Sequence, residues 1–512
     1  MKKVMQFLFG RIFITAILIL VQVAWFTVFL LKLTEYSVWI HAAFSLLSLF
    51  IVLYLIKNDD NSSFKIGWIV LVMLMPVFGG VLYTLFGSKL PANKMRKRLA
   101  VRHSELAPQL GSDMTAAAAL QREDLRTYSR SRYITDSSAY PVWQNTSTTY
   151  YPLGEEMYAA MLEELEKAES FIFMEYFIIK PGVMWNGILD ILKRKAAAGV
   201  DVRLICDDMG SLFVLPNGFA KEMESYGIKT LMFNPFVPLM SLVMNNRDHR
   251  KITVIDGHTA FNGGINLSDE YINAVEVYGH WKDTGVRIVG DAVWNFTMMF
   301  LELWHAYRPE SAREDVSVFK PNARHAGAFE TDGFVQPFSD SPLDGEALSE
   351  SVYIDILARA TSYVYIFTPY LIISEIMQTA LCAAVKRGVD VRLVTPGVPD
   401  KKVVYRLTRS YYGPLLKAGV RIYEYTPGFI HAKSYISDDD TGIVGTINMD
   451  FRSLYLHFEC GTYMYRTSAL AALKADALET IAKSHEVSEK EVSRSSFGRL
   501  LDAVLRVFAP LC

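Results

Sequence analysis

A motif of histidine, lysine and aspartate that occurs twice at the same spacing is the feature that most constrains this 512-residue chain. The motif is His-x-Lys-x4-Asp, and in both copies six residues separate its aspartate from a Gly-x2-Asn segment. The copies consist of His249, Lys251, Asp256 and Asn266, and of His431, Lys433, Asp438 and Asn448. Because the chain has only ten histidines, coincidence does not account for two matches with the same tail. The two copies indicate an internal duplication.

Each motif predicts a strand, a turn and a returning strand. Residues two apart on a strand lie on one face, so the histidine and the lysine of each copy point the same way. The segments after them are β-rich and reach a turn at Asp256-Gly257 in one copy and at Asp438-Asp439 in the other. The returning strand then brings the asparagine back beside the histidine and the lysine. Two such half-sites, face to face, would surround a volume the size of a phosphate.

The paired groups are suited to the transfer of a phosphodiester. The lysines and asparagines are expected to hold the phosphate oxygens and to offset the negative charge that repels a nucleophile. The expected phosphate-binding residues are Lys251, Lys433, Asn266 and Asn448. One neutral imidazole can attack phosphorus and form a phosphohistidine, while the other, protonated, gives its proton to the leaving alkoxide. An ordinary histidine pKa of about 6.5 suits both roles, and the chemistry alone allows either order.

A second repeat predicts the fold. The segment Gly-Val-Asp-Val-Arg-Leu occurs at 199–204 and again at 388–393. Each copy follows a helix-like stretch, which itself follows an apolar strand. The helix-like stretches are 185–198 and 374–387, and the strands before them are 170–179 and 362–372. Strand, helix, strand is a βαβ unit. Its duplication favours an α/β protein of two tandem lobes with pseudo-two-fold symmetry and one shared active site.

Two acids downstream of the motifs are candidates to orient the histidines. Asp283 and Glu459 occupy corresponding places, in Trp281-Lys282-Asp283 and His457-Phe458-Glu459, and each precedes an apolar strand. A carboxylate on the second imidazole nitrogen would fix the tautomer of each histidine. The alternative is that both are exposed acids at the ends of strands.

The N-terminal part of the chain predicts transmembrane helices. Residues 12–31, 36–56 and 66–87 contain no charged side chain, and each stretch reaches the ~20 residues needed to cross a bilayer. The basic run from Lys89 to Arg102 should lie in the cytoplasm, and it is also suited to bind anionic lipid. Because the N-terminus is basic as well, three crossings cannot place both ends inside. Two or three crossings therefore stay open, with the catalytic region cytoplasmic in both cases.

The composition argues against several other classes of protein. Lysine and arginine number 52 against 54 aspartate and glutamate, whereas nucleic-acid-binding domains are usually strongly basic. The four cysteines stand far apart, so neither a disulfide framework nor a zinc site is expected. No cluster of carboxylates offers a site to a metal ion, and no metal or cofactor is expected.

The expected organisation has five parts. They are a membrane anchor over 1–88, a basic and polar linker over 89–135, a first lobe over 136–310, an inter-lobe linker over 311–345, and a second lobe with a C-terminal helix over 346–512. Apolar residues recur at helical spacing between Phe497 and Phe508. We expect this last helix to pack on the second lobe rather than to lie on the membrane surface.

The paired motifs resemble those of the phospholipase D superfamily, and the sequence from about Tyr133 onward is similar to its bacterial cardiolipin synthase branch. The supporting segments are 173–179, 266–271, 367–370 and 448–453. Thr446 stands where this family more often has serine or glycine, and it keeps a hydroxyl. The resemblance implies His249 as nucleophile and His431 as general acid. It also includes Asp256 and Asp438 in the catalytic motif, although these aspartates often serve structure in the superfamily.

The resemblance implies a phosphatidyltransferase in the bacterial inner membrane. Phosphatidylglycerol would be both donor and acceptor, and the products would be cardiolipin and glycerol, formed without a cofactor. A phospholipase D-type hydrolase would share the site but admit water, and another alcohol is a further possible acceptor. A nuclease of the superfamily would lack the anchor, and a non-catalytic membrane scaffold would be expected to have lost a motif residue. The oligomeric state and regulation stay open.

Overall fold

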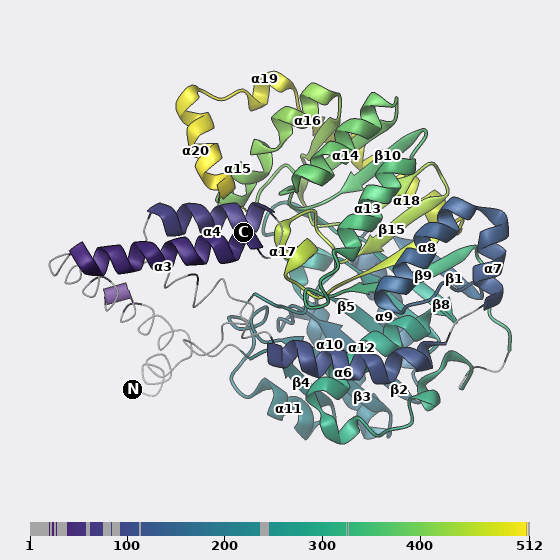
Figure 1. The fold of residues 1–512 in the computed structure, drawn as a ribbon. Coiled ribbons are helices and arrows are strands. Elements are labelled where there is room, and N and C mark those ends of the chain that lie inside the picture. Colours follow the sequence, from purple (N-terminus) through teal and green to yellow (C-terminus); the bar gives the residue numbers. More distant parts are fainter. Residues whose placement is uncertain are drawn as a thin grey trace.

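A computed structural model describes residues 38–57, 62–74, 93–111, 114–235, 245–323 and 327–507, together with a few isolated positions. Two mixed β-sheets, each with its own helices, form two lobes that are stacked in the view of Figure 1. The first sheet and its helices α9–α12 occupy the lower part of the view, and the second sheet and its helices occupy the upper part (Figure 1).

The first lobe is built on a seven-stranded sheet with the order β1-β8-β6-β5-β2-β3-β4. Its strands are β1 (Thr146–Tyr151), β2 (Phe171–Tyr176), β3 (Asp201–Asp207), β4 (Lys229–Phe233), β5 (Lys251–Ile255), β6 (Thr259–Gly263) and β8 (Gly285–Gly290). Its helices are α9 (Gly154–Lys167), α10 (Val183–Ala197), α11 (Phe219–Ser225) and α12 (Val293–Tyr307). Strands β2, β3 and β4 run parallel, and β5, β6, β8 and β1 continue the sheet in antiparallel pairs.

The second lobe is built on an eight-stranded sheet with the order β17-β12-β11-β10-β14-β15-β16-β9. Its strands are β9 (Phe334–Asp340), β10 (Tyr363–Phe367), β11 (Asp390–Pro396), β12 (Arg421–Tyr425), β14 (Ser434–Ser437), β15 (Thr441–Gly445), β16 (Glu459–Tyr465) and β17 (Ser484–Glu486). Its helices are α13 (Leu348–Arg359), α14 (Glu375–Lys386), α15 (Lys402–Ser410), α16 (Tyr412–Ala418), α17 (Phe451–Tyr455), α18 (Ala469–Ala482), α19 (Glu489–Val492) and α20 (Ser496–Val507).

The two sheets repeat the same arrangement. Strands β10, β11 and β12 run parallel, as β2, β3 and β4 do, and an antiparallel set ends each sheet on the other side. Helices α10 and α14 connect the first parallel pair in each lobe, and the two repeated Val-Asp-Val-Arg-Leu segments begin at or next to β3 and β11. The sequence prediction of two tandem α/β lobes is therefore confirmed.

A short sheet joins the lobes. Strand β7 (His280–Lys282) of the first lobe pairs in parallel with β13 (Gly428–Ile430) of the second. On the other side of the pseudo-two-fold axis, Asp248 and Phe458 form a single parallel bridge. In each lobe the segment just before a motif histidine is therefore paired with the segment before the downstream acid of the other lobe.

The segment 89–135, predicted to be a linker, contains packed helices. These are α6 (Asn93–Leu110), α7 (Met114–Glu123) and α8 (Leu125–Ser138), the last of which extends beyond the predicted end. Helix α6 buries Met95, Leu99, Leu106 and Leu110 in the same apolar cluster as α12. Helix α8 lies on the second lobe, where Arg130 donates to Asp355 at 2.5 Å and to the Tyr463 hydroxyl at 3.0 Å. The apolar residues of α6 recur at helical spacing, which favours docking over a free tether.

The segment 311–345, also predicted to be a linker, contributes a strand to the second lobe. Strand β9 pairs with β16 over its whole length, from Phe334 opposite Tyr465 to Asp340 opposite Glu459. The described part of the segment before β9 contains only short helical turns at 309–311, 316–319 and 321–323.

The helices α3 (Val38–Lys57) and α4 (Ser62–Leu74) pack together and project from the two-lobed body (Figure 1). The Phe64 ring of α4 contacts the rings of Phe451 and Tyr455 in α17, at centroid distances of 5.7 and 6.1 Å. Within the described residues, no helix is both long enough and apolar enough to cross a membrane. The predicted span 12–31 and most of 75–87 lie outside the described residues.

Candidate active site

The two motif histidines are held by backbone from the opposite lobe. The backbone N–H of His249 donates to the carbonyl oxygen of Phe458 at 2.9 Å, and that of His431 donates to the carbonyl oxygen of Lys282 at 2.7 Å. These bonds extend the inter-lobe pairings around β7 and β13. The site is therefore formed at the junction of the lobes, and neither lobe contains a complete half-site.

The downstream acids are exchanged between the lobes. Nδ1 of His249, in the first lobe, lies 2.9 and 3.0 Å from the two carboxylate oxygens of Glu459 in the second. Nδ1 of His431, in the second lobe, lies 2.6 Å from Oδ2 of Asp283 in the first. Both acids are fully buried. A carboxylate at Nδ1 favours the tautomer with its proton there and leaves Nε2 with a free lone pair.

The residue after the first glycine of each Gly-x2-Asn segment lies against the downstream acid of its own lobe. A Cβ at Gly264 would lie 2.1 Å from Oδ1 of Asp283, so only glycine permits that carboxylate its place. In the second lobe the Thr446 hydroxyl donates to the Glu459 carboxylate. The difference between Gly264 and Thr446 is thus a local adjustment to two acids of different length.

Both motif lysines are buried against their own histidines. Nζ of Lys251 donates to the carbonyl oxygen of His249 at 2.6 Å. Nζ of Lys433 donates to the carbonyl oxygen of His431 and lies 2.6 Å from its Nδ1 and 3.0 Å from its Nε2. Burial lowers the pKa of Lys251 to about 8 and that of Lys433 to about 7. Each lysine is then a cation that can lose its proton near neutral pH.

Both imidazoles resist protonation in the free site. Burial lowers the pKa of His249 to about 3, although Glu459 opposes the shift. Burial and then the charge of Lys433 lower the pKa of His431 to about 4, against the effect of Asp283. Although burial opposes it, the pKa of Asp283 is lowered, mainly by the charge of Lys433, and that of Glu459 is lowered by its interactions with the His249 and His457 imidazoles, so both acids stay ionised.

The two motif asparagines differ in their contacts. Oδ1 of Asn266 accepts from the backbone N–H of Ile178 at 3.0 Å, and its Nδ2 donates to the Tyr271 hydroxyl at 2.7 Å. The Tyr271 ring in turn lies 5.3 Å from the ring of His431. Oδ1 of Asn448 is buried and, within the described part of the chain, has no hydrogen-bond partner. Asn266 therefore links the first lobe to the imidazole of the second, and Asn448 keeps unused hydrogen-bonding capacity.

The motif aspartates do not reach the imidazoles. The Asp256 carboxylate accepts from the backbone N–H groups of residues 169, 170 and 171 at 2.7–2.9 Å. The Asp438 carboxylate does the same for residues 361, 362 and 363 at 2.7–2.9 Å. Both aspartates have positive φ, 49° and 52°, which aspartate tolerates in a turn. The geometry does not support their inclusion among the catalytic residues; they tie the motif hairpins to the start of β2 and β10.

Aromatic rings flank each imidazole, and the sequence interpretation assigned them no role. The ring centroids of Tyr271 and Trp281 are 5.3 and 5.6 Å from that of His431 and 4.9 Å from each other. Those of Phe177 and His457 are 5.0 and 5.5 Å from that of His249 and 6.5 Å from each other. The signal was present, because Trp281 and His457 each stand two residues before an orienting acid and so share its face of the strand.

One group of side chains could hold a metal ion. Within the described residues, only His249, His457 and Glu459 bring three donor atoms within 4.8 Å of one another. The Glu459 oxygens already accept from His249 and from the Thr446 hydroxyl, so hydrogen bonds explain this arrangement. That the reaction needs no metal stays a prediction.

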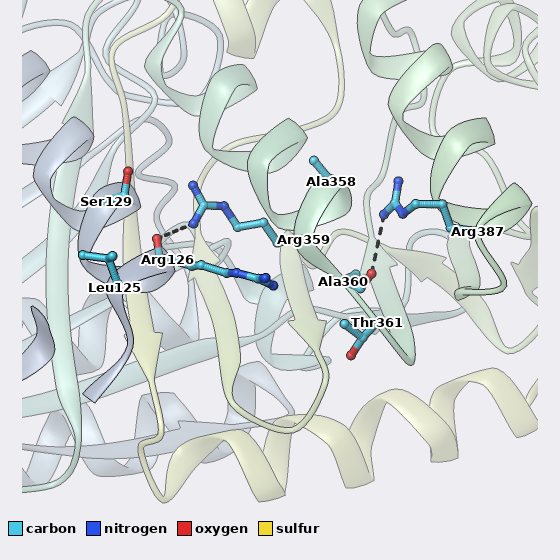
Figure 2. Close-up of a pocket in the computed structure, with 8 residues that line it drawn as sticks. All are labelled: Leu125, Arg126, Ser129, Ala358, Arg359, Ala360, Thr361 and Arg387. Atoms are coloured by element: carbon cyan, nitrogen blue, oxygen red, sulfur yellow. Dashed lines mark hydrogen bonds between the residues drawn. The ribbon is translucent and has the colours of Figure 1, made fainter. Parts of the chain in front are cut away.

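A separate surface pocket lies between α8, the end of α13 and α14 (Figure 2). Its lining includes Arg126, Arg359 and Arg387 but no motif residue. Arg359 donates to the carbonyl oxygen of Arg126, and Arg387 donates to the carbonyl oxygen of Leu357 at 2.6 Å. Two of its three cations are thus already engaged with backbone, and the pocket has no catalytic group.

Two α/β lobes that share a pair of acid-linked histidines define a phospholipase D-like protein. Residues 161–289 and 353–480 both match the family described as cardiolipin synthase, phospholipase D-like domain. Residues 45–88 match the phospholipase D-nuclease N-terminal family. The chain belongs to the cardiolipin synthase family of phospholipase D-like proteins.

Relatives of the chain match it over most of its length. It is 33% identical to cardiolipin synthase 2 of Bacillus cereus over 89% of this chain and 88% of that protein. It is 32% identical to a cardiolipin synthase of Geobacillus thermodenitrificans over 90% and 91%. An uncharacterized protein of Streptococcus mutans is 43% identical over 90% of this chain and 99% of its own.

Among solved structures, a phosphatidylserine synthase of Haemophilus influenzae has a similar fold. It matches with a TM-score of 0.53 and 15% identity over 75% of this chain and 98% of that protein. At this identity the likeness concerns the fold alone.

Proposed function

We propose that this chain is a cardiolipin synthase that transfers the phosphatidyl group of one phosphatidylglycerol to the terminal hydroxyl of a second. The observation that carries this proposal is the exchange of acids between the lobes, which engages Nδ1 of both buried imidazoles and leaves Nε2 for the reaction, with Lys433 beside that of His431. The family membership supports the substrate and the reaction class, a phosphatidyltransferase.

In the first half-reaction, Nε2 of His249 attacks the phosphorus of the donor lipid. A bond forms between Nε2 and phosphorus, and the bond from phosphorus to the headgroup glycerol oxygen breaks. His431 gives the proton on its Nε2 to that oxygen, and glycerol leaves. The assignment of His249 as nucleophile rests on the order implied by the family, because the geometry of the two imidazoles is nearly symmetric.

In the second half-reaction, the roles of His431 reverse. Its neutral Nε2 takes the proton from the terminal hydroxyl of a second phosphatidylglycerol while that oxygen bonds to phosphorus. The bond from phosphorus to Nε2 of His249 breaks, cardiolipin leaves, and His431 is protonated for the next cycle. Water in place of the lipid alcohol would give phosphatidic acid, so the exclusion of water decides between transferase and hydrolase.

The buried lysines supply the electrostatic stabilisation in this mechanism. Lys251 and Lys433 lie on the same strand faces as their histidines and would bind the phosphate oxygens when a lipid is present. The incoming phosphodiester charge would raise the pKa of both lysines and both imidazoles. Because Nζ of Lys433 lies 3.0 Å from Nε2 of His431, this lysine can hold the proton that His431 needs for the leaving group. Asn448 could join them on the phosphate only through its Nδ2, because its unpartnered atom, Oδ1, is an acceptor.

We also propose that residues 1–88 anchor the enzyme in the bacterial inner membrane as a multi-pass segment, with the lobes in the cytoplasm. The three apolar stretches of the sequence and the family match over 45–88 support the anchor. The basic residues between Lys89 and Arg102 support the cytoplasmic side. The first lobe would then occupy 136–310 and the second 346–512, with α6–α8 packed against both and β9 completing the second sheet.

The test is product analysis with the purified full chain in phosphatidylglycerol vesicles. We expect cardiolipin and glycerol in equal amounts by mass spectrometry, with added chelator causing no loss. His249→Ala and His431→Ala, as matched controls, should give no product. Phosphatidic acid as the main lipid product would instead identify a hydrolase, and no product from the unaltered chain would contradict the proposal.

A further inference from the structure

The C-terminal helix α20 turns an apolar stripe to the outside of the molecule. Phe497, Leu500, Leu501 and Val504 are 76%, 62%, 38% and 48% exposed. At 3.6 residues per turn these four side chains lie within an arc of roughly 100°. Single exposed apolar residues are ordinary, but a continuous apolar stripe on an amphipathic helix marks an interaction surface.

The side of α20 that faces the second lobe makes mainly polar contacts. Of the apolar residues expected to pack there, Leu505 is half-buried against the lobe, whereas Phe497, Leu500, Leu501 and Val504 are exposed. Asp502 is 8% exposed and accepts from Nε of Arg406 at 2.8 Å. Nη2 of Arg406 also donates to the carbonyl oxygen of Gly498, and Nε of Arg506 donates to the Ser410 hydroxyl at 3.1 Å. These bonds tie α20 to α15 through polar groups, so the apolar stripe cannot pack on the lobe as expected.

The stripe lies next to the helices that project from the body. A Cβ on Gly67 of α4 would lie 2.8 Å from the carbonyl oxygen of Val507, at the end of α20. Figure 1 shows α20, α4 and α3 on the same side of the molecule. This neighbouring pair also has exposed large apolar side chains, namely Leu46, Leu47, Leu49, Phe50, Leu53, Tyr54, Ile56, Ile66 and Met73. The stripe of α20 therefore extends an apolar surface that α3 and α4 begin.

We propose that α20 lies in the headgroup region of a lipid bilayer, with Phe497, Leu500, Leu501 and Val504 inserted among the acyl chains. An amphipathic helix that lies parallel to a membrane inserts its apolar side among the lipids. Because the stripe continues the exposed apolar side chains of α3 and α4, which belong to the proposed membrane anchor, we favour lipid as the occupant.

This contact goes beyond the proposed reaction, because it sets how the catalytic body stands on the membrane. The anchor alone holds the body by one side and leaves it free to tilt. Helix α17 begins just after Asn448 and touches α4 through Phe451. A second contact through α20 would hold this edge of the second lobe, which contains α17, against the bilayer.

A fluorescent probe on the full chain tests the lipid contact directly, without a measurement of enzyme activity. In a Cys382→Ser, Cys512→Ser background, the environment-sensitive dye NBD is attached at Leu501→Cys, on the stripe, or at Ala503→Cys, on the neighbouring exposed side. In phosphatidylcholine–phosphatidylglycerol vesicles we expect blue-shifted emission and strong quenching by doxyl-labelled lipid at 501 and little of either at 503. Equal quenching at both positions would contradict the proposal. A blue shift at 501 without lipid quenching would identify a protein occupant and also overturn it.

A matched pair of double variants tests the consequence for activity. Phe497→Asp with Val504→Asp places two carboxylates on the stripe. Ser496→Asp with Ala503→Asp places the same two charges one residue earlier, about 100° around the helix. We expect the first pair to lower turnover on vesicles on the order of tenfold while sparing detergent-dispersed lipid, and the second pair to spare both. The same loss from both pairs would contradict a role for the stripe.

Discussion

At the scale of single residues, the position of the transferable proton in the free site is decided by burial. Both imidazoles are neutral at physiological pH, since their pKa values are about 3 for His249 and about 4 for His431. Lys433, with a pKa of about 7 and its Nζ within hydrogen-bonding distance of His431, holds the proton instead. A free enzyme with a neutral nucleophile and a protonated lysine is the form that the proposed mechanism needs.

The pH dependence of kcat/KM should therefore be displaced from that of ordinary histidines. As pH falls, His249 stays neutral until its pKa of about 3 is approached, so the acid limb should lie well below the usual histidine range. As pH rises through about 7 to 8, Lys433 and then Lys251 lose their protons and kcat/KM should fall. A pH series on detergent-dispersed phosphatidylglycerol measures this. An acid limb near 6.5 would show that the imidazoles titrate normally and that the proton assignment is wrong.

Amidation of either orienting acid should affect the histidine of the other lobe. Glu459→Gln removes the carboxylate at Nδ1 of His249, and Asp283→Asn does so at His431. We expect kcat to fall on the order of 10²–10⁴-fold in each variant, because the tautomer with a free Nε2 is no longer favoured. Glu163→Gln, at an exposed position of α9, serves as the charge control. Near-normal kcat in Glu459→Gln would remove that acid from the site.

Loss of a motif aspartate should cost stability rather than chemistry. Asp256→Ala leaves three backbone N–H groups without their acceptor and is expected to lower the free energy of unfolding by about 2–3 kcal/mol. Asp256→Asn keeps an acceptor oxygen and the positive φ and should lose less. Denaturant unfolding and kcat of the folded fraction separate the two effects. If Asp256→Ala abolished kcat without lowering the free energy of unfolding, Asp256 would have to be counted as a catalytic residue.

The sequence allows the identity of the site residues to be predicted but not their partners. The duplicated spacing is sufficient to select the histidines and the lysines. The two downstream acids lie at different distances, 34 residues after His249 and 28 after His431, and only their place before an apolar strand points to them. Which acid accepts from which histidine depends on the pairing of β7 with β13. This pairing joins residues 148 positions apart in sequence, such as Trp281 and Phe429, and no local pattern predicts it. The low pKa values follow from burial at the lobe junction, which no local pattern reports.

At the scale of elements, the periodicity of apolar residues predicts the βαβ units well, but it does not predict which surfaces the other helices pack against. The predicted helix at 185–198 is α10, and the one at 374–387 is α14. Segment 89–135 was predicted to be a linker, but it forms helices, and α6 and α8 bury residues in the cores of the lobes. Helix α20 contacts the second lobe, but it does so through Asp502 and Leu505, while Phe497, Leu500, Leu501 and Val504 stay exposed.

A chain without the anchor should keep its chemistry only if α6–α8 are kept. A chain that begins at Asn93 retains the contacts of Leu99 and Arg130, so it should fold and turn over detergent-dispersed phosphatidylglycerol. On vesicles it should be less efficient, because the anchor no longer raises the local concentration. A chain that begins near Tyr133 lacks these helices and should melt at a lower temperature. If the Asn93 chain folds but cannot process dispersed lipid, the N-terminal residues must form part of the substrate path.

At the scale of the whole molecule, both lobes contribute to the candidate site, so we expect catalysis to require both. Each lobe contributes a histidine, a lysine and the acid that orients the other lobe's histidine, and the duplicated sheets bring these groups together across a pseudo-two-fold axis. The near symmetry suits a reaction in which glycerol leaves and a similar alcohol enters by the reverse route. The symmetry of the two half-sites is not exact, because the neighbour of His431 is Trp281 and the corresponding neighbour of His249 is His457.

The most direct test of this account is to trap the covalent intermediate in His431→Ala with a phosphatidyl ester of p-nitrophenol. The activated leaving group needs no general acid, so the first half-reaction can proceed, while the second lacks its base. We predict stoichiometric release of p-nitrophenol and, by mass spectrometry of the quenched protein, a phosphatidyl group on His249. The same substrate with His249→Ala should give neither. A phosphatidyl group on His431 in the reciprocal variant His249→Ala, with none on His249 in His431→Ala, would contradict the assignment.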